Sequence, residues 1–289
     1  MSWSNIERFY RPETISAAIN LVQQSGDKGS LLAGGTDIAV KCDASVRSLI
    51  DLSRLPLNFL RQRKDYWAIG AMTRVTKLIE SDALKSYGDG LLISAAQRFG
   101  SKQIRNMATV GGNLANASPV ADLAPPLLVF DAWVLLASEC GRRLLPLDEF
   151  FLAAHNSPRQ REILLELRIP IRAGRKCCTW SFRKFGRTVC DIALVNAASA
   201  VSLGRDGRCE WARVAVGGIA PVPIRLKNVE NRLRGEELTG KTIDRACELI
   251  GSEIEPISDL RGSADYRKEI ASGMVREVLS ECGSRAVPL

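Results

Sequence analysis

The sequence predicts a protein of the α+β class with about two domains. Its 289 residues are enough for two domains at roughly 150 residues each. Short strands and helices alternate in the first half, whereas a run of strands followed by a run of helices fills the part after residue 175. The segment 170–177 places proline, glycine and several basic residues between two strands. We therefore expect a first domain over 1–174 and a second over 175–289.

The first fifty or so residues have the pattern of a small β-α-β-β unit, a subdomain of about residues 1–55. Thr14 is the candidate N-cap of its helix, and Ser25-Gly26 is the expected stop. A second subdomain, 56–174, begins after Pro56. The expected elements up to residue 174 are strands 6–10, 31–33 and 47–52, a helix from 15, a hairpin of 59–63 with 66–70, a helix capped by Thr73, a helix over 90–100, a hairpin of 133–137 with 143–145, and a strand 162–169.

The second domain is expected to begin with three strands, over 179–185, 191–203 and 210–216. The last two are joined at Arg205-Asp206-Gly207-Arg208, because Asp-Gly supplies the positive φ angles of a tight hairpin turn. Helices follow over 227–234, 243–250 and 264–281.

Two stretches with paired glycines dominate the candidate binding residues. Leu31-Leu-Ala-Gly-Gly-Thr-Asp37 and Ala108-Thr-Val-Gly-Gly-Asn113 each place two glycines and small polar side chains after apolar residues expected to be extended. Such glycines allow φ > 0 and leave amides uncovered for an anion. One pair alone would be a plain tight turn, but two of matching chemistry favour a ligand. Neither stretch has the glycine spacing of a Rossmann fold or a P-loop.

Composition and charge exclude several classes of function. The eight cysteines show no zinc or iron–sulfur spacing, and His155, the only histidine, rules out a histidine-based metal site or a Ser-His-Asp triad within the chain. We expect His155 to be solvated in a polar loop. The net charge of +8 is scattered in short basic groups, so it indicates no nucleic-acid site. Without a signal peptide or a long apolar run, the protein is expected to be cytoplasmic, with no membrane span.

Ser118-Pro119 has the pattern of a helix start, which Pro125-Pro126 would end. Asp122 lies one residue too late to complete a capping box. Two interpretations of Asp122 remain about equally good: a favourable charge in the first helical turn, or a carboxylate that accepts hydrogen bonds from the hydroxyls of a bound sugar or ribityl chain.

These motifs resemble the FAD-binding subunit of molybdenum hydroxylases, which includes the medium subunits of xanthine dehydrogenases and carbon monoxide dehydrogenases. The resemblance rests on Ala33–Asp37, on Gln103–Asn113 and on Ala117–Asp122. It continues in the second half through Lys184-Phe-Gly-Arg187, Gly217-Gly-Ile-Ala-Pro221 and Asp259-Leu-Arg-Gly-Ser263 with Tyr266-Arg267. It implies the FAD-binding fold of vanillyl-alcohol oxidase and p-cresol methylhydroxylase, in two α+β subdomains, followed by a C-terminal α+β flavoprotein domain.

The resemblance also implies which residues bind FAD, and it names no catalytic or metal-binding residue. It places the pyrophosphate against the main chain of 32–37 and 108–112, and the sugar and ribityl hydroxyls against Asn113, Asn116 and Asp122. A basic residue, Lys184 or its neighbour Arg183, is placed beside the flavin. The implied set is Leu32, Ala33, Gly34, Gly35, Thr36, Asp37, Ala108, Thr109, Val110, Gly111, Gly112, Asn113, Asn116, Asp122, Ile163, Phe182, Arg183 and Lys184.

The activity implied by the resemblance is electron transfer, in an enzyme most similar to xanthine dehydrogenase. A large partner subunit would hold the molybdenum cofactor and hydroxylate the substrate. Electrons would pass through two [2Fe–2S] clusters of a small partner subunit to FAD here, and then to NAD⁺ or another acceptor. Two alternatives remain open: a self-sufficient FAD-dependent oxidoreductase, and a scaffold subunit without cofactor.

Gly35→Val and Gly111→Val are each expected to abolish FAD binding while leaving a soluble, partly destabilised protein. The reason drawn from the sequence is that a branched Cβ blocks φ > 0 and fills the approach of the phosphate. Flavin content of the purified variants is the measurement, and stoichiometric flavin in both would contradict the pyrophosphate assignment.

Overall fold

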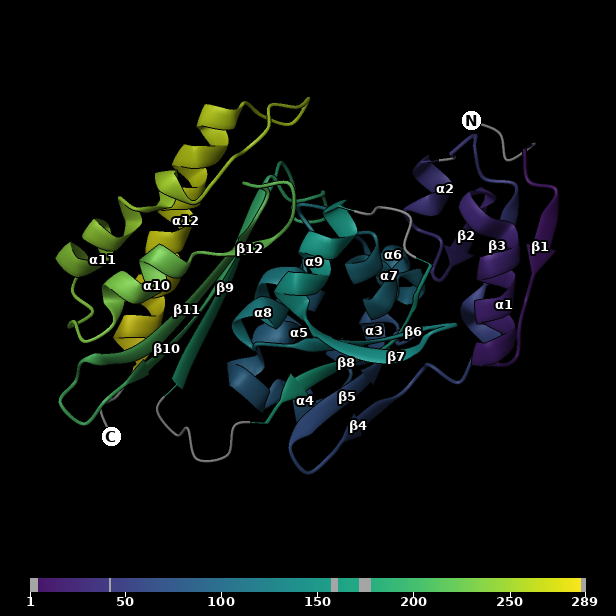
Figure 1. The fold of residues 1–289 in the computed structure, drawn as a ribbon. Helices are drawn as coiled ribbons and strands as arrows, with labels where there is room; N and C mark the ends of the chain where they lie inside the picture. The colour runs from purple at the N-terminus through teal and green to yellow at the C-terminus, as the bar shows by residue number, and fades with distance from the viewer. Residues whose placement is uncertain (1–4, 42, 157–160, 172–177, 287–289) are drawn as a thin grey trace. The chain divides into compact units, whose positions relative to one another are not determined.

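A computed structural model of the protein describes residues 5–41, 43–156, 161–171 and 178–286 (Figure 1). The chain forms two compact units, and neither is continuous in the sequence. Unit 1 consists of Met1–Lys77, Ser101–Asn116 and Ala132–Ile171, and unit 2 of Leu78–Gly100, Ala117–Asp131 and Arg172–Leu289. The expected boundary segment, 170–177, lies outside the described residues from 172 onward.

Unit 1 begins with a parallel three-stranded sheet of order β1-β3-β2. Its elements are β1 (Arg8–Tyr10), α1 (Ile15–Ser25), β2 (Gly29–Leu32), a short helix α2 (Ile38–Lys41) and β3 (Ser48–Asp51). The caps of α1 are those expected, because Thr14 Oγ1 accepts the amide proton of Ala17 at 3.1 Å and Gly26 takes a φ of 51°. The expected β-α-β-β pattern is confirmed, with α2 added.

The second sheet of unit 1 has five antiparallel strands in the order β4-β5-β8-β6-β7. Its strands are β4 (Leu60–Gln62), β5 (Tyr66–Gly70), β6 (Trp133–Ser138), β7 (Gly141–Pro146) and β8 (Ile163–Pro170). Both expected hairpins are confirmed. The helices over this stretch of chain are α3 (Val75–Ile79), α6 (Lys102–Met107), α7 (Val110–Ala115) and α9 (Leu147–Asn156). Ile50, Ile163 and Leu165 belong to one apolar core that draws on both sheets.

Two expectations for this unit are wrong. Thr73 does not cap α3, which begins at Val75; its buried hydroxyl donates instead to the carbonyl of Phe59 at 2.8 Å, across the β4–β5 hairpin. His155 is exposed, as expected, but it lies in the last turn of α9 rather than in a loop.

Unit 2 is built on an antiparallel four-stranded sheet of order β12-β11-β10-β9. The strands are β9 (Cys178–Phe185), β10 (Val195–Leu203), β11 (Cys209–Gly217) and β12 (Ile224–Arg225). The helices are α4 (Asp82–Lys85), α5 (Leu91–Gln97), α8 (Ala124–Val129), α10 (Lys227–Leu233), α11 (Gly240–Cys247) and α12 (Ala264–Arg285). Gly207 takes a φ of 77°, as the expected turn between β10 and β11 requires.

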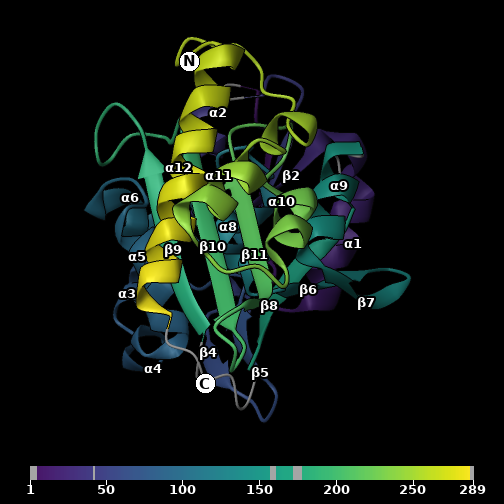
Figure 2. The same cartoon turned by 90° about the vertical axis from the view of Figure 1, so that its left-hand side faces the viewer.

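Helices cover both faces of this sheet. The long α12 runs along β9, β10 and β11, as Figure 2 shows, and shares an apolar core with α10 and α11. The shorter α5 and α8, from the inserted segments, pack against β9 and against β10 and β11. Every residue of β10 is consequently buried.

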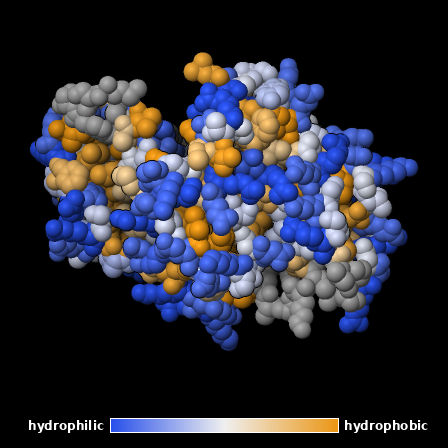
Figure 3. Space-filling model, turned by 180° about the vertical axis from the view of Figure 1, so that it is seen from behind, coloured by the Kyte–Doolittle hydropathy of each residue, from blue (hydrophilic) through white to orange (hydrophobic). Residues whose placement is uncertain are grey.

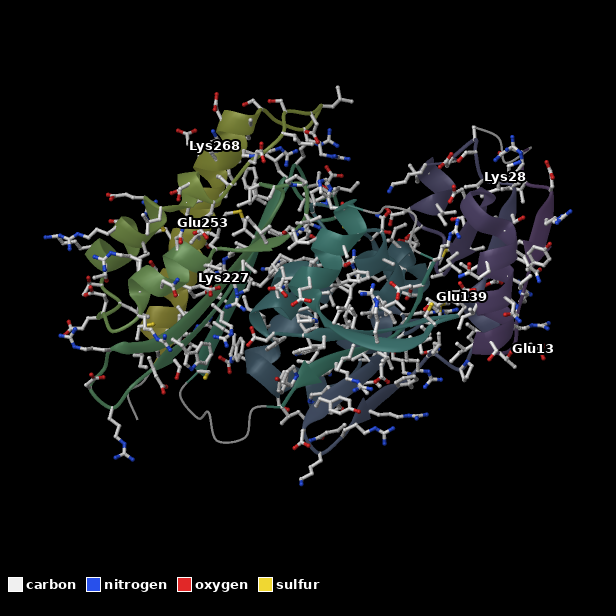
Figure 4. The ribbon with its side chains drawn as sticks, in the orientation of Figure 1. Glu13, Lys28, Glu139, Lys227, Glu253 and Lys268 are labelled. Atoms are coloured by element: carbon white, nitrogen blue, oxygen red, sulfur yellow. The ribbon has the colours of Figure 1, made fainter. Side chains whose placement is uncertain are left out.

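An ion-pair cluster and a helix-terminal hydrogen bond fix two of the helices of unit 2. Asp131, which ends the inserted segment after α8 with a φ of 53°, accepts hydrogen bonds from Arg213 at 2.8 Å and Arg225 at 2.6 Å. At the N-terminus of α10, the Glu253 carboxylate accepts the amide proton of Asn228 at 3.0 Å, where negative charge is favoured by the helix dipole (Figure 4).

Hydrophilic residues occupy most of the molecular face in Figure 3. Among the helices of the described residues, none has the length and apolar content that crossing a bilayer requires.

The hydrogen bonds of Asp51 predict how the free energy of unfolding depends on pH. Burial raises the pKa of this carboxyl, but hydrogen bonds from Ser53 and from Arg11 outweigh burial and hold the pKa below its ordinary value. The resulting stability is fully present above the unfolded-chain pKa of about 3.9 and is lost as the pH falls through the lower folded-state pKa. Asp51→Asn should therefore lower the free energy of unfolding by about 1–2 kcal/mol at neutral pH.

Urea unfolding at neutral pH and in acid measures this difference. The gap between wild type and variant should shrink in acid, and a gap that stays constant would contradict the assignment. Asp65→Asn, at an exposed carboxylate in the β4–β5 turn, is the control and should change little.

Candidate functional site

The first glycine pair lies directly after β2. Gly35 has a φ of 73°, and the nearest atom to an added Cβ would be Leu32 Cδ1 at 3.4 Å, so the position needs glycine for its backbone angle rather than for space. The carbonyl of Gly35 accepts the amide proton of Ala39 at 2.9 Å and so joins the pair to α2. The expected positive φ is confirmed at this residue.

The backbone amides of residues 34–37 are uncovered donors in unit 1. None of these four N–H groups donates a hydrogen bond to any residue that the structure describes. Successive free amides at a turn form a small concave site of positive potential, which favours an anion such as a phosphate. This part of the expected site has the required chemistry.

The second glycine pair does not form a loop after a strand, and that expectation is wrong. Gly111 and Gly112 lie in the first turn of α7, whose N-cap is Thr109. The amide of Gly111 donates to the carbonyl of Ala71 at 2.9 Å, and that of Gly112 donates to Thr109 Oγ1 at 3.0 Å. Val110 likewise donates to Thr73, at 2.9 Å. These amides are therefore used within the protein, and neither glycine has a positive φ.

Close packing explains the second pair instead. A Cβ on Gly111 would lie 2.6 Å from Ala71 Cβ and 2.7 Å from its carbonyl oxygen. Because helix α7 approaches the end of β5 this closely, only glycine fits. Gly111→Val is thus still expected to be destabilising, but for steric reasons rather than through its φ angle.

Gly34 brings the two stretches together. A Cβ at Gly34 would lie 2.8 Å from the carbonyl carbon of Met107 and 2.9 Å from Ala108 Cα, so the two backbones touch. Lys41 Nζ, on α2, donates to Asn116 Oδ1 at 2.6 Å. Residues 32–37 and 108–116 therefore lie in contact in unit 1, although Ala108–Gly111 and Leu114 are buried.

Two other expected residues of unit 1 have different environments. Asn113 Oδ1 is buried and has no hydrogen-bond partner among the described residues. A buried amide oxygen is costly to leave unpaired, so this atom is suited to accept a hydrogen bond from a ligand. Ile163, in contrast, is fully buried in the apolar core of the unit.

The stretch from Ser118 to Asp122 is a series of turns in unit 2, not a helix. Helix α8 begins at Ala124, so Pro125 and Pro126 lie in its first turn and do not end a helix. Proline is favoured there because the first amides of a helix have no partner within it. Asp122 consequently lies outside any helix, and its interpretation as a first-turn charge is wrong.

Asp122 is the centre of a buried polar network. Its Oδ2 accepts a hydrogen bond from Lys184 Nζ at 2.6 Å, and its Oδ1 accepts one from Asn196 Nδ2 at 3.1 Å. The same ammonium donates to the carbonyl of Arg98 at 2.8 Å. The side chains of Asp122 and Lys184 are only 9% and 3% exposed. Burial raises the pKa of the Asp122 carboxyl, while Lys184 and Asn196 act in the opposite direction.

Side chains alternate between the two faces of β9, and this decides which of the two basic residues, Arg183 or Lys184, faces Asp122. Successive side chains of a strand point to opposite faces. Arg183 pairs with Glu277 at 2.6 Å and Glu281 at 2.9 Å on α12. Lys184 points to the other face, the side of Asp122, and Phe182, two residues earlier, is buried there. The structure thus brings Lys184, and not Arg183, together with Asp122.

Sequence reasoning missed Asn196. It lies on β10, 74 positions after Asp122, inside a strand in which every residue is buried. The one available signal is its amide side chain within the otherwise small and apolar run Val195-Asn-Ala-Ala-Ser199.

Comparison with known proteins defines the class of this protein. Residues 4–172 match the family described as the FAD binding domain in molybdopterin dehydrogenase, and residues 180–282 match the CO dehydrogenase flavoprotein C-terminal domain. The fold and both matches define a flavoprotein, an oxidoreductase subunit that binds FAD. The chain belongs to the family of FAD-binding subunits of molybdenum hydroxylases.

Relatives match over nearly the whole chain. It is 31% identical to the carbon monoxide dehydrogenase medium chain of Hydrogenophaga pseudoflava over 283 residues, covering 96% of this chain and 97% of that one. It is 30% identical to the xanthine dehydrogenase FAD-binding subunit of Escherichia coli O157:H7, covering 96% of both. A solved structure of the Hydrogenophaga carbon monoxide dehydrogenase superimposes with a TM-score of 0.90 at 29% identity, over 98% of this chain and 99% of that chain.

The residues present fit FAD, with one restriction. Free amides at 34–37 and the unpaired oxygen of Asn113 provide donors and an acceptor that a dinucleotide can use. The amides of residues 110–112 are taken up within the protein, so of the two glycine pairs the first is the one that offers uncovered main-chain donors.

Alanine substitutions should distinguish the roles of Gly34 and Gly35. Gly35→Ala should cost about 1–2 kcal/mol of stability through its positive φ and should weaken FAD binding by about tenfold or more, since the amides are re-aimed. Gly34→Ala should destabilise unit 1 further, because its Cβ would meet the backbone of Met107 and Ala108.

Gly26→Ala is the matched control. Gly26 also has a positive φ, of 51°, and its added Cβ meets nothing within 4 Å. The control should lose similar stability to Gly35→Ala but keep wild-type FAD affinity. Equal FAD affinity in all three variants, measured by flavin fluorescence titration, would argue against a phosphate site at 34–37.

Proposed function

We propose that this chain is the electron-transfer subunit of a three-subunit molybdenum hydroxylase. In this proposal it receives electrons from [2Fe–2S] clusters of a small partner subunit and passes them to NAD⁺ or another acceptor. A large partner subunit would hold the molybdenum cofactor and the substrate. The observation that carries the proposal is the match, over both domains and 96% of this chain, to a carbon monoxide dehydrogenase medium chain and a xanthine dehydrogenase FAD-binding subunit.

The residues of the site have distinct roles in this proposal. The amides of 34–37 bind the pyrophosphate of FAD, and Asn113 and Asn116 bind hydroxyl groups of the cofactor. Asp122 accepts hydrogen bonds from sugar or ribityl hydroxyls, since each carboxylate oxygen keeps a lone pair beyond those used by Lys184 and Asn196. The flavin itself, when bound, supplies the redox centre, while the protein supplies binding and orientation.

The substrate class is not a property of this chain in the proposal. Relatives named for carbon monoxide, 6-hydroxypseudooxynicotine and xanthine are 31%, 32% and 30% identical to it. Nearly equal sequence identity to relatives named for different substrates is expected when the substrate binds to another subunit. A xanthine dehydrogenase-like enzyme remains our preferred assignment from the motifs.

The test begins with the purified chain and then with its complex. The isolated chain should be yellow and release stoichiometric FAD, and NADH should reduce that flavin if NAD⁺ is the physiological acceptor. Purification through a tag on this chain should recover two further subunits with molybdenum and iron. A purine, an aldehyde, an aromatic heterocycle and carbon monoxide are then tested for reduction of the flavin.

The outcomes separate the alternatives. Substrate should reduce the flavin in the complex but not in the isolated chain. Reduction of the isolated chain by one of these substrates would support a self-sufficient oxidoreductase instead. A colourless chain that FAD cannot reconstitute would support a scaffold subunit and overturn the proposal.

A further inference from the structure

The turn from Ser118 to Asp122 is held by three neighbouring strands of unit 2. Lys184 on β9 and Asn196 on β10 contact the carboxylate of Asp122. At the end of β11, the amide of Gly218 donates to the carbonyl of Pro119 at 2.8 Å. The strands thus fix both the backbone of the turn and the side chain that it carries.

Asn196 contacts both the backbone of this turn and the side chain of Asp122. Its Nδ2 donates to Asp122 Oδ1 at 3.1 Å and to the carbonyl of Val120 at 3.4 Å. The side chain is completely buried on β10, whose backbone pairs with strands on both sides. The amide group therefore has little freedom to rotate and defines where the carboxylate lies.

The glycines of the Gly217-Gly218 motif allow this close approach. A Cβ on Gly217 would lie 2.7 Å from the carbonyl oxygen of Pro119 and would overlap Asn196 Oδ1, while Gly218 has a φ of 88°. Arg267 supports the same point, since its buried guanidinium donates to the carbonyl of Gly218 at 3.2 Å and to that of Leu194 at 2.6 Å. Two motifs of the second domain therefore converge on one turn.

A purely structural role does not account for Asn196. Its Oδ1 is buried and has no hydrogen-bond partner among the described residues. An unpaired buried amide oxygen costs stability, and an apolar side chain in this strand would avoid that cost. The retained amide is explained by what its Nδ2 does for Asp122.

We propose that Asn196 is a positioning residue for FAD binding: it holds the Asp122 carboxylate aimed so that its free lone pairs accept cofactor hydroxyls. The inference rests on the proposed function, in which Asp122 binds those hydroxyls. Asn196 occupies one lone pair of Oδ1 and Lys184 one of Oδ2, which leaves one acceptor on each oxygen. Lys184 is the charged side chain that faces Asp122 within the described part of the chain.

The test uses the full chain stripped of flavin, titrated with FAD between about pH 6 and pH 8. Asn196→Ala removes the donor, so the dissociation constant of FAD should rise about tenfold, and more at the acidic end where Asp122 is more readily protonated. Asn196→Asp should show the opposite pH dependence, with the weakest FAD binding at the alkaline end of the range. A proton shared by the two carboxyls preserves the hydrogen bond at low pH, and its loss at higher pH places two buried negative charges together.

Ser199→Ala is the matched control. Ser199 is also fully buried on β10, but its hydroxyl donates to the carbonyl of Val278 on α12 at 2.9 Å. This variant should lower the melting temperature and leave the affinity for FAD and its pH profile unchanged. A purely structural Asn196 would give the same result as Ser199→Ala, and that outcome would overturn the inference.

Asp122→Asn separates the role proposed for Asp122 from the role proposed for Asn196. If this variant binds FAD as wild type does, the role proposed for Asp122 fails. If it binds weakly while both Asn196 variants match wild type across the pH range, the inference about Asn196 fails alone.

Discussion

The burial of the Asp122 and Lys184 charges is the constraint on which the arrangement of unit 2 depends. Moving a carboxylate and an ammonium out of water costs far more than one hydrogen bond returns, unless the remaining donors and acceptors are also satisfied. The carbonyl of Arg98 and the amide of Asn196 supply these further bonds. Each comes from a different element, so the pair can exist only where α5, β9, β10 and the turn before α8 meet.

In unit 1 the corresponding constraint is the close approach of one backbone segment to another. At Gly34 and at Gly111, backbone lies against backbone where any other residue would collide. The first contact joins the turn after β2 to the stretch before α7, and the second seats α7 against the end of β5. The first amides of α7 are used internally, whereas those of 34–37 donate to no residue that the structure describes. The two glycine pairs are alike in sequence but perform different tasks.

Features with a local cause could be predicted from the sequence. The Thr14 cap, the positive φ of Gly35 and the Asp206-Gly207 turn each depend on a few adjacent residues. Tertiary contacts decided the features that were missed. Thr73 has the side chain of a cap, but its hydroxyl is used across a hairpin. The partners of Asp122 lie 62 and 74 positions away, and no local pattern indicates that they contact it.

The discontinuity of the two units bears on how the protein is made. Leu78–Gly100 and Ala117–Asp131 belong to unit 2, yet they leave the ribosome before β9, the first strand of the sheet that covers them. Leu91, Leu92, Leu127 and Leu128, which end up buried, have no sheet to pack on during that interval. The apolar faces of these segments therefore lack the sheet that will cover them while the rest of unit 1 is synthesised. Because α12 supplies much of the core of unit 2, that core is complete only after α12 has been synthesised.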